Sequence, residues 1–105
     1  MSFLTDAAAI VGSSGAWCKG ANARDASGKW CSPLSPNAVA WDVYGALMKA
    51  WHSNVAYHDS DFQTALAYVR AKIPAAFTGG GARKNTDIEA YNDTLAFGSV
   101  AGLFS

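Results

Sequence analysis

The polar side chains best suited to contact a ligand lie near the C-terminus, in the tripeptide Tyr91-Asn92-Asp93. The Asn92 amide offers donors and acceptors, and the Asp93 carboxylate offers acceptors. The same residue types also end helices, because they hydrogen-bond their own backbone. The preferred interpretation is therefore a helix end. A ligand site becomes attractive if Asp93 lies near Trp17 or Trp41 on a concave surface.

The tryptophans provide a second candidate, because aromatic faces stack on bases and nucleotides. Trp41 and Trp51 lie within an apolar stretch and are expected to pack in the core. Trp17 and Trp30 flank a polar segment, so for these two residues a position at the rim of a site is as plausible as packing in the core. The residues predicted to line a ligand site are Trp17, Arg24, Trp30, Trp41, Asn92 and Asp93.

A glycine-rich basic loop covers residues 79–84. Its side chains Arg83 and Lys84, with the predicted helix start at Thr86, could hold one anion. However, the loop lacks the Gly-Lys-Ser/Thr ending of a phosphate-binding loop, and no buried strand precedes it. A linker is therefore the preferred interpretation.

No catalytic residue, metal site or cofactor is predicted. The segment with His52, His58, Asp59 and Asp61 matches no metal-ligand spacing. Its two aspartates more simply favour the positive end of a helix, and no Gly-x-Ser-x-Gly motif is present. A small hydrolase-like enzyme in which Asp93 or Asp42 acts with a histidine stays open as an alternative. If Asp42 is buried in its apolar surroundings, desolvation should raise its pKa.

The elements that must position these residues are mostly helices. Apolar residues recur at helical spacing from Phe3 to Val11, and the glycines and serines of residues 12–15 follow them. Residues 16–32 contain the turn signal Asp25-Ala26-Ser27-Gly28, which indicates a short two-stranded hairpin or an ordered loop.

A central helix is expected over residues 36 to about 52. Ser35-Pro36 is typical of a helix start, and the following run is apolar almost all round. Gly45 in this run costs about 1 kcal/mol relative to alanine in a helix. This cost indicates that another backbone approaches closely there.

Two further helices are predicted from capping boxes, in which side chains three residues apart bond the first turn. Ser60 and Gln63 form one such pair, before a helix that Pro74 ends. This helix has the apolar stripe Phe62, Leu66, Val69 and Ile73. Thr86-Asp87-Ile88-Glu89 predicts a second, short helix that ends at residues 92–94, and residues 99–104 predict a terminal helical turn. The expected fold is one mainly α domain over residues 1–105, with three to four helices and a small β-hairpin between helices 1 and 2.

Composition excludes several classes of protein. The chain has 105 residues, 50% of them hydrophobic and 15% charged, with eight basic and eight acidic side chains. The low charged fraction argues against disorder, and zero net charge argues against general nucleic-acid binding. No apolar run is long enough to span a membrane, and no secretory signal is expected. Cys18 and Cys31 are expected to be reduced, with at least one partly buried, in a cytoplasmic protein.

Three short motifs occur in a familiar order: Trp17-Cys18-Lys19-Gly20, then Trp41 followed by Gly45-Ala46-Leu47, then Tyr91-Asn92-Asp93. In this order the chain resembles a family of small bacterial and bacteriophage proteins, a domain of unknown function. The resemblance covers residues 4–104 and departs in a shorter final helix after Asp93. It implies a mainly helical domain in a prokaryotic or viral setting and supplies no activity.

The expected function is binding without catalysis. In a phage or prokaryotic setting the chain would occupy a host protein or sequester a small, nucleotide-like ligand, for example in counter-defence against the host. Its partner would be a protein or a small anionic ligand, in the host cytoplasm if phage-encoded. A structural or virion-associated subunit that packs against its own copies is the second alternative beside the enzyme.

Overall fold

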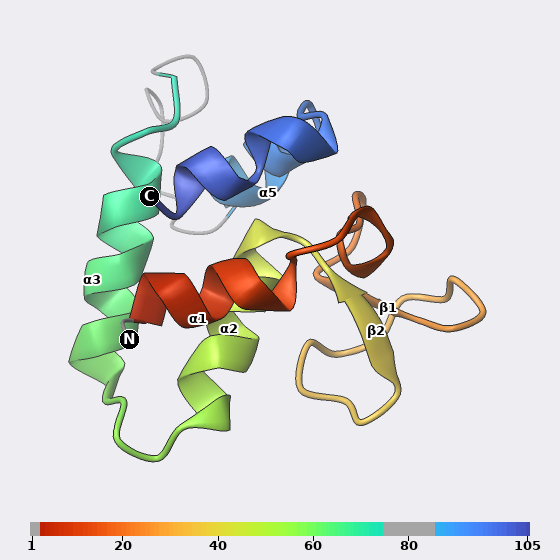
Figure 1. Ribbon diagram of the computed structural model, residues 1–105, viewed down its shortest axis with the longest axis horizontal. Coiled ribbons are helices and arrows are strands. Elements are labelled where there is room, and N and C mark those ends of the chain that lie inside the picture. Colours follow the sequence, from red (N-terminus) through yellow and green to blue (C-terminus); the bar gives the residue numbers. More distant parts are fainter. Residues whose placement is uncertain (1–2, 75–85) are drawn as a thin grey trace.

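The computed structural model describes residues 3–74 and 86–105. The elements follow one another along the chain as α1 (Phe3–Ile10), η1 (Ser14–Ala16), β1 (Ala23–Asp25), β2 (Ala38–Trp41), α2 (Val43–Ser53), α3 (Asp59–Arg70), α5 (Thr86–Asn92), η2 (Phe97–Ser99) and η3 (Ala101–Leu103). The elements labelled η are single 3₁₀ turns. The mainly α fold and the small antiparallel strand pair between α1 and α2 confirm the predicted fold class (Figure 1).

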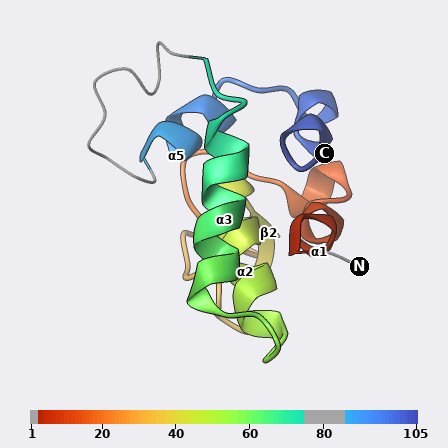
Figure 2. The same ribbon diagram turned by 90° about the vertical axis from the view of Figure 1, so that its left-hand side faces the viewer.

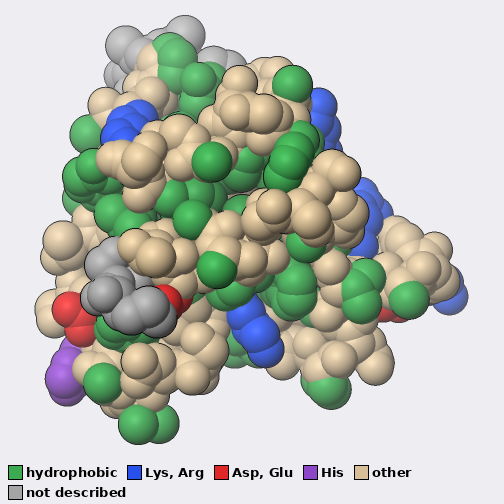
Figure 3. Space-filling view, viewed as in Figure 1, with side chains coloured by type: hydrophobic (Ala, Val, Ile, Leu, Met, Phe, Trp, Pro, Cys, Tyr) green, Lys and Arg blue, Asp and Glu red, His purple; other side chains and the backbone are tan. Residues whose placement is uncertain are grey.

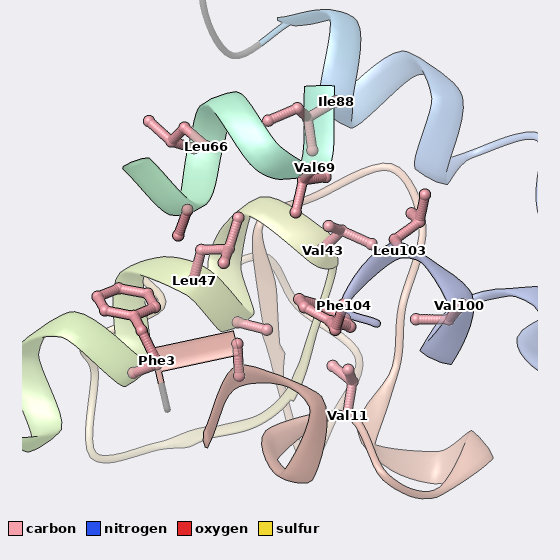
Figure 4. Close-up of a cluster of buried hydrophobic side chains, with 14 of the residues drawn as sticks. Phe3, Val11, Val43, Leu47, Leu66, Val69, Ile88, Val100, Leu103 and Phe104 are labelled. Carbon is pink, nitrogen blue, oxygen red and sulfur yellow. The ribbon is translucent and has the colours of Figure 1, made fainter. Parts of the chain in front are cut away.

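Helix α2 is central, because it contacts α1, α3 and α5. Figure 2 shows α3 in front of α2, which it contacts, and α1 to one side of them. Helix α2 buries residues at helical spacing, including Val43 and Leu47. Figure 4 shows side chains from α1, α2, α3, α5 and the C-terminal turns meeting in one apolar cluster. No helix within the described ranges has the length and apolar character needed to cross a membrane.

Helices α1 and α3 lie largely where the periodicity predicts them. Phe3, Ala7 and Val11 are buried, and so is the whole predicted stripe of α3. The predicted capping box of α3 is two residues too late, because His58 is the N-cap residue and its backbone N–H donates to Asp61 Oδ2 at 2.8 Å. At the other end of α3, Arg70 Nε donates to the buried Asp87 Oδ2 at 2.8 Å, which joins α3 to α5.

The predicted start of the central helix at Ser35-Pro36 is wrong. Residues 38–41 form β2 instead, which pairs antiparallel with β1 in the register Ala23↔Trp41. Helix α2 begins only at Val43, where the Asp42 carboxylate caps it by accepting the Gly45 N–H at 2.6 Å. The boundary is not visible in the sequence, because β2 and α2 both consist largely of apolar residues. Between them lies only Asp42.

The turn predicted within residues 16–32 is confirmed. Gly28 has a φ of +84° and its N–H donates to the Asp25 carbonyl at 2.9 Å. After the turn the chain folds back on β1, where Cys31 N–H donates to the Ala23 carbonyl at 3.0 Å. The main partner of β1 is nevertheless β2, which lies outside the segment predicted to form a hairpin. Both cysteines are free: Cys18 is buried and Cys31 is half-buried.

Candidate functional site

Asn92, the last residue of α5, is completely buried and joins distant segments of the chain. Its Oδ1 accepts hydrogen bonds from Trp17 Nε1 at 2.8 Å and from the Val43 backbone N–H at 3.0 Å. Its Nδ2 donates to the Cys18 carbonyl at 3.1 Å and to Asp93 Oδ1 at 3.2 Å. Both donors and both acceptor positions of the amide are therefore used within the protein. Asn92 does end α5, but its side chain holds distant segments together instead of bonding its own backbone.

Trp17 and Trp41 are adjacent, as their backbones form a parallel bridge, and both pack against the core. The Trp41 Nε1–H donates to the Pro33 carbonyl at 2.9 Å, so both indole donors have protein partners. The Arg24 side chain also has hydrogen-bond partners within the protein. Its guanidinium donates to the Lys19 carbonyl at 3.0 Å and to the Gly28 carbonyl at 2.9 Å, which ties together the loops on either side of β1.

A hollow of about 270 Å³ lies beside this cluster. Residues 20–22 form one wall, and the other lining residues are Trp30, Asp42, Glu89 and Asp93. Of the predicted ligand residues, Trp30 and Asp93 line the hollow, and Trp30 is 68% exposed. Trp17, Arg24, Trp41 and Asn92 do not line it, although Asn92 bonds the lining residue Asp93 directly.

Two residues that line the hollow, Glu89 and Asn22, are not among the residues predicted to line a ligand site. Glu89 precedes Asp93 by four residues, a spacing that brings side chains together on one helical face, and this signal could have indicated it. Asn22 lies in an irregular loop and carries no periodic signal. Its Nδ2 donates to Asp42 Oδ2 at 3.1 Å and to Glu89 Oε2 at 2.6 Å, so one amide holds two carboxylates together.

The described lining of the hollow carries three carboxylates and no basic side chain. Asp42 is 2% exposed, and burial raises its pKa to about 7. This pKa is the balance of burial and the Glu89 and Asp93 carboxylates, which raise it, and the hydrogen bonds from Gly45 and Asn22, which lower it. Within the described ranges, none of these three carboxylates forms a salt bridge.

The geometry of Asp93 is set by the loop opposite. Its Oδ1 accepts the Gly20 backbone N–H at 2.9 Å, as well as the Asn92 amide. Gly20 has a φ of +78°, a conformation that residues with a side chain rarely adopt. The loop of residues 20–22 is thus attached to the end of α5 across the hollow.

The other candidate groups lie away from the hollow or outside the described residues. Neither histidine lines it, and His58 is exposed beside Asp61, with 3.7 Å between Nδ1 and Oδ2. The described residues contain no His, Cys, Asp or Glu group of three or more arranged to hold a metal ion. Arg83, Lys84 and the side chain of Thr86 lie outside the described part of the structure.

Cys18 lies near the hollow, but its thiol is poorly suited to act as a nucleophile. Burial, together with the nearby Asp42 carboxylate, raises its pKa to about 11. The reactive form of a cysteine is the thiolate, which a raised pKa makes scarce at neutral pH. The hollow therefore combines carboxylates, amides and an exposed indole without an activated nucleophile.

These features define a small, mainly helical domain with a carboxylate-lined hollow between a hairpin loop and the end of a helix. Residues 2–104 match the family model of DUF6197, described as a family of unknown function, and the chain belongs to this family. The predicted resemblance to a domain of unknown function is thereby confirmed. Neither the curated proteins nor the solved structures include a match to the chain.

Proposed function

We propose that this chain is a small, non-enzymatic binding protein that holds a ligand, or a side chain of a host protein, in the hollow beside Trp30. The observation that carries the proposal is the convergence of residues 20–22, Trp30, Asp42 and the end of α5 on one concave surface. A bacterial or bacteriophage origin, a role in host interaction and a cytoplasmic location belong to the same proposal. They rest on the resemblance of the sequence motifs and on composition.

Binding is favoured over catalysis by the chemistry of the lining. A general acid–base pair with histidine needs a histidine within hydrogen-bond reach of the reacting group, and the lining has none. The carboxylates instead hold neutral donors: the Asn22 amide bonds Asp42 and Glu89, and the Gly20 N–H bonds Asp93. Such fixed polar groups beside an exposed aromatic ring are typical of sites that orient a ligand.

The test is a nuclear magnetic resonance titration of the ¹⁵N-labelled full chain with small cationic, anionic and neutral compounds at millimolar concentration. We expect at least one compound to shift the backbone amides of Gly20, Asn22, Glu89 and Asp93. Trp30→Ala should weaken that binding about fivefold or more, because truncating a large aromatic contact costs about 1 kcal/mol or more. The matched control is Val55→Ala, which truncates another exposed hydrophobic residue.

Two results would contradict the proposal. One is that no compound shifts these four amides. The other is that the shifts are confined to the apolar groove of about 210 Å³ between α1 and α3, which is lined by Phe3, Leu4 and Tyr68 among others.

This groove favours the alternative of a self-assembling subunit. Figure 3 shows hydrophobic side chains interspersed on the face that carries α1, and Tyr68 on α3 is 43% exposed. Apolar surface of this kind can pack against a second copy of the chain. Light scattering after size exclusion separates the two functions. A monomer at high concentration excludes self-assembly, and a dimer that Tyr68→Glu dissociates supports it.

A further inference from the structure

The charges around the hollow lack a cationic partner among the described residues. Asp42, Glu89 and Asp93 line it, and the described lining contains no Lys or Arg. Arg24 on nearby β1 keeps its positive charge while it donates to two neutral backbone carbonyl groups, but it does not line the hollow. The recorded partners of the three carboxylates are neutral N–H groups of Asn22, Gly45, Gly20 and Asn92. Among the described residues, the three carboxylates are therefore held close together without an ion pair.

The carboxylates also retain capacity to accept hydrogen bonds. Glu89 Oε1 and Asp93 Oδ2 have no recorded partner in the described ranges, and each carboxylate offers about four acceptor positions. Both residues are more accessible than the buried Asp42, so these oxygen atoms are the ones a ligand can reach. An anion such as a nucleotide phosphate would be repelled here, whereas a cation would be attracted.

Trp30 provides an independent reason for a cationic ligand. Its side chain is 68% exposed although tryptophan is usually well buried, and it borders the same hollow as the carboxylates. The face of an indole ring attracts ammonium and guanidinium groups electrostatically. The hollow, at about 270 Å³, is slightly smaller than the roughly 300–1,000 Å³ of typical small-molecule pockets. It fits a single compact head group.

We propose that the hollow binds a primary ammonium group, supplied by a free small amine or by a lysine side chain of a partner protein. An ammonium is compact and carries three donors, which suit Glu89, Asp93 and the more deeply placed Asp42. This inference rests on the proposed function, since a preference for cationic ligands presupposes that the hollow binds a ligand. It replaces the anionic ligand expected from the sequence with one of opposite charge.

A proton should be released when the cation binds. The titratable groups that face Asp42 are Glu89 and Asp93 at α5, Tyr44 on α2 and the Cys18 thiol. The pKa of Asp42 is about 7, so part of its population is protonated below neutrality. A bound ammonium favours the ionised form, which means that binding should tighten as the pH rises from 6 to 8.

The experiment is a titration of the labelled full chain with n-butylammonium chloride, 1-butanol and AMP at constant ionic strength, at pH 6 and pH 8. A lysine-containing tripeptide, Ac-Gly-Lys-Gly-amide, is compared with its ε-acetylated form to distinguish the sources. We expect the ammonium compounds to shift the amides of Gly20, Glu89 and Asp93. Their affinity should be several-fold higher at pH 8 than at pH 6. Binding of the peptide but not of butylammonium would assign the ligand to a protein partner.

Variants that remove the negative charges but keep the size of the side chains test whether charge governs binding. The double variant Glu89→Gln/Asp93→Asn retains acceptors for Asn22 and Gly20 while removing both charges, and it should bind the cation about tenfold more weakly. Asp42→Ser should remove the pH dependence. The matched control for lost negative charge is Asp59→Asn, at an exposed position in the first turn of α3. Thermal melts check that each variant folds.

The outcomes distinguish this inference from the proposed function. If AMP or butanol shifts the hollow amides more strongly than butylammonium, the cation inference is overturned while the binding function stands. The inference is also overturned if the double variant binds butylammonium as tightly as the unchanged chain. If no compound shifts these amides, both proposals fail.

Discussion

Asn92 and Asp42 are buried within a few hydrogen bonds of each other and have opposite consequences for the site. Asn92 is neutral, and all of its hydrogen-bonding positions are used within the chain. Asp42 is a buried carboxylate whose partners are the neutral groups of Gly45 and Asn22. A buried charge without an opposite charge destabilises the folded chain, so the two residues should respond differently to pH.

The stability of the chain should decrease as the pH rises from about 4 to 7. Burial raises the pKa of Asp42 from 3.8 to about 7, so the folded chain binds more protons than the unfolded chain in this window. The free energy of unfolding then falls with increasing pH and levels off above 7, a total effect on the order of 4 kcal/mol. Urea denaturation at unit steps of pH measures it.

Asp42→Ser keeps an N-cap acceptor and removes the titrating group, so its stability should vary less over the same window. Asp59→Ser, at an exposed position, serves as the control and should retain the decline of the unchanged chain. Parallel curves for Asp42→Ser and the unchanged chain would show that another group governs the pH dependence.

At the scale of elements, the site depends on how closely α2 lies against the loop of residues 20–22. The Asp42 N–H donates to the Asn22 carbonyl at 3.2 Å, at the start of α2. A Cβ atom added at Gly45 would lie 2.0 Å from the same carbonyl oxygen, closer than real Cβ atoms come to other atoms. The close backbone approach predicted for Gly45 is thus confirmed.

Gly45→Ala should therefore destabilise the chain although alanine is the better helix former. Helix propensity gains about 1 kcal/mol, whereas the backbone shift needed to relieve the contact costs about 1–3 kcal/mol or more. We expect a net loss of about 1 kcal/mol or more in urea denaturation, with changed chemical shifts in residues 20–22. In the control Gly15→Ala the new Cβ meets no atom within 4 Å. An unchanged or higher stability of Gly45→Ala would show that the loop moves away easily.

At the scale of the whole molecule, Asn92 connects the segment after η1, the start of α2 and the end of α5. Its bonds to Trp17 and Cys18 span 75 and 74 positions of the chain. The bond to Val43 spans 49 positions. The hollow lies where these three segments meet, so its shape depends on this one side chain.

Asn92→Ala should lower the free energy of unfolding by about 2–4 kcal/mol. It leaves the Trp17 Nε1–H, the Val43 N–H and the Cys18 carbonyl without their partner, and a buried unsatisfied group costs about 1–3 kcal/mol. Chemical denaturation measures the loss, with the exposed Asn37→Ala as the control. Equal stability of the two variants would contradict the structural role of Asn92.

Much of the helical fold follows from local patterns in the sequence. Helices α1 and α3 have apolar residues at helical spacing, and the buried stripes coincide with that spacing. The turn at residues 25–28 follows from Asp25 and Gly28, whose local chemistry demands it. The boundary between β2 and α2 was missed because both are apolar, and only pairing with β1 decides where the strand ends.

The sequence by itself thus determined the apolar periodicity of α1 and α3, the turn at residues 25–28 and the tight position of Gly45, because each depends on residues a few positions apart. Tertiary structure decided which polar groups meet. Asn22 and Glu89 are 67 positions apart, yet one hydrogen bond of 2.6 Å joins them. Only the packing of α5 and the hairpin against α2 brings Asp42, Glu89 and Asp93 to one hollow. The local spacing of Glu89 and Asp93 brings those two carboxylates together, but only the fold places the distant Asp42 beside them.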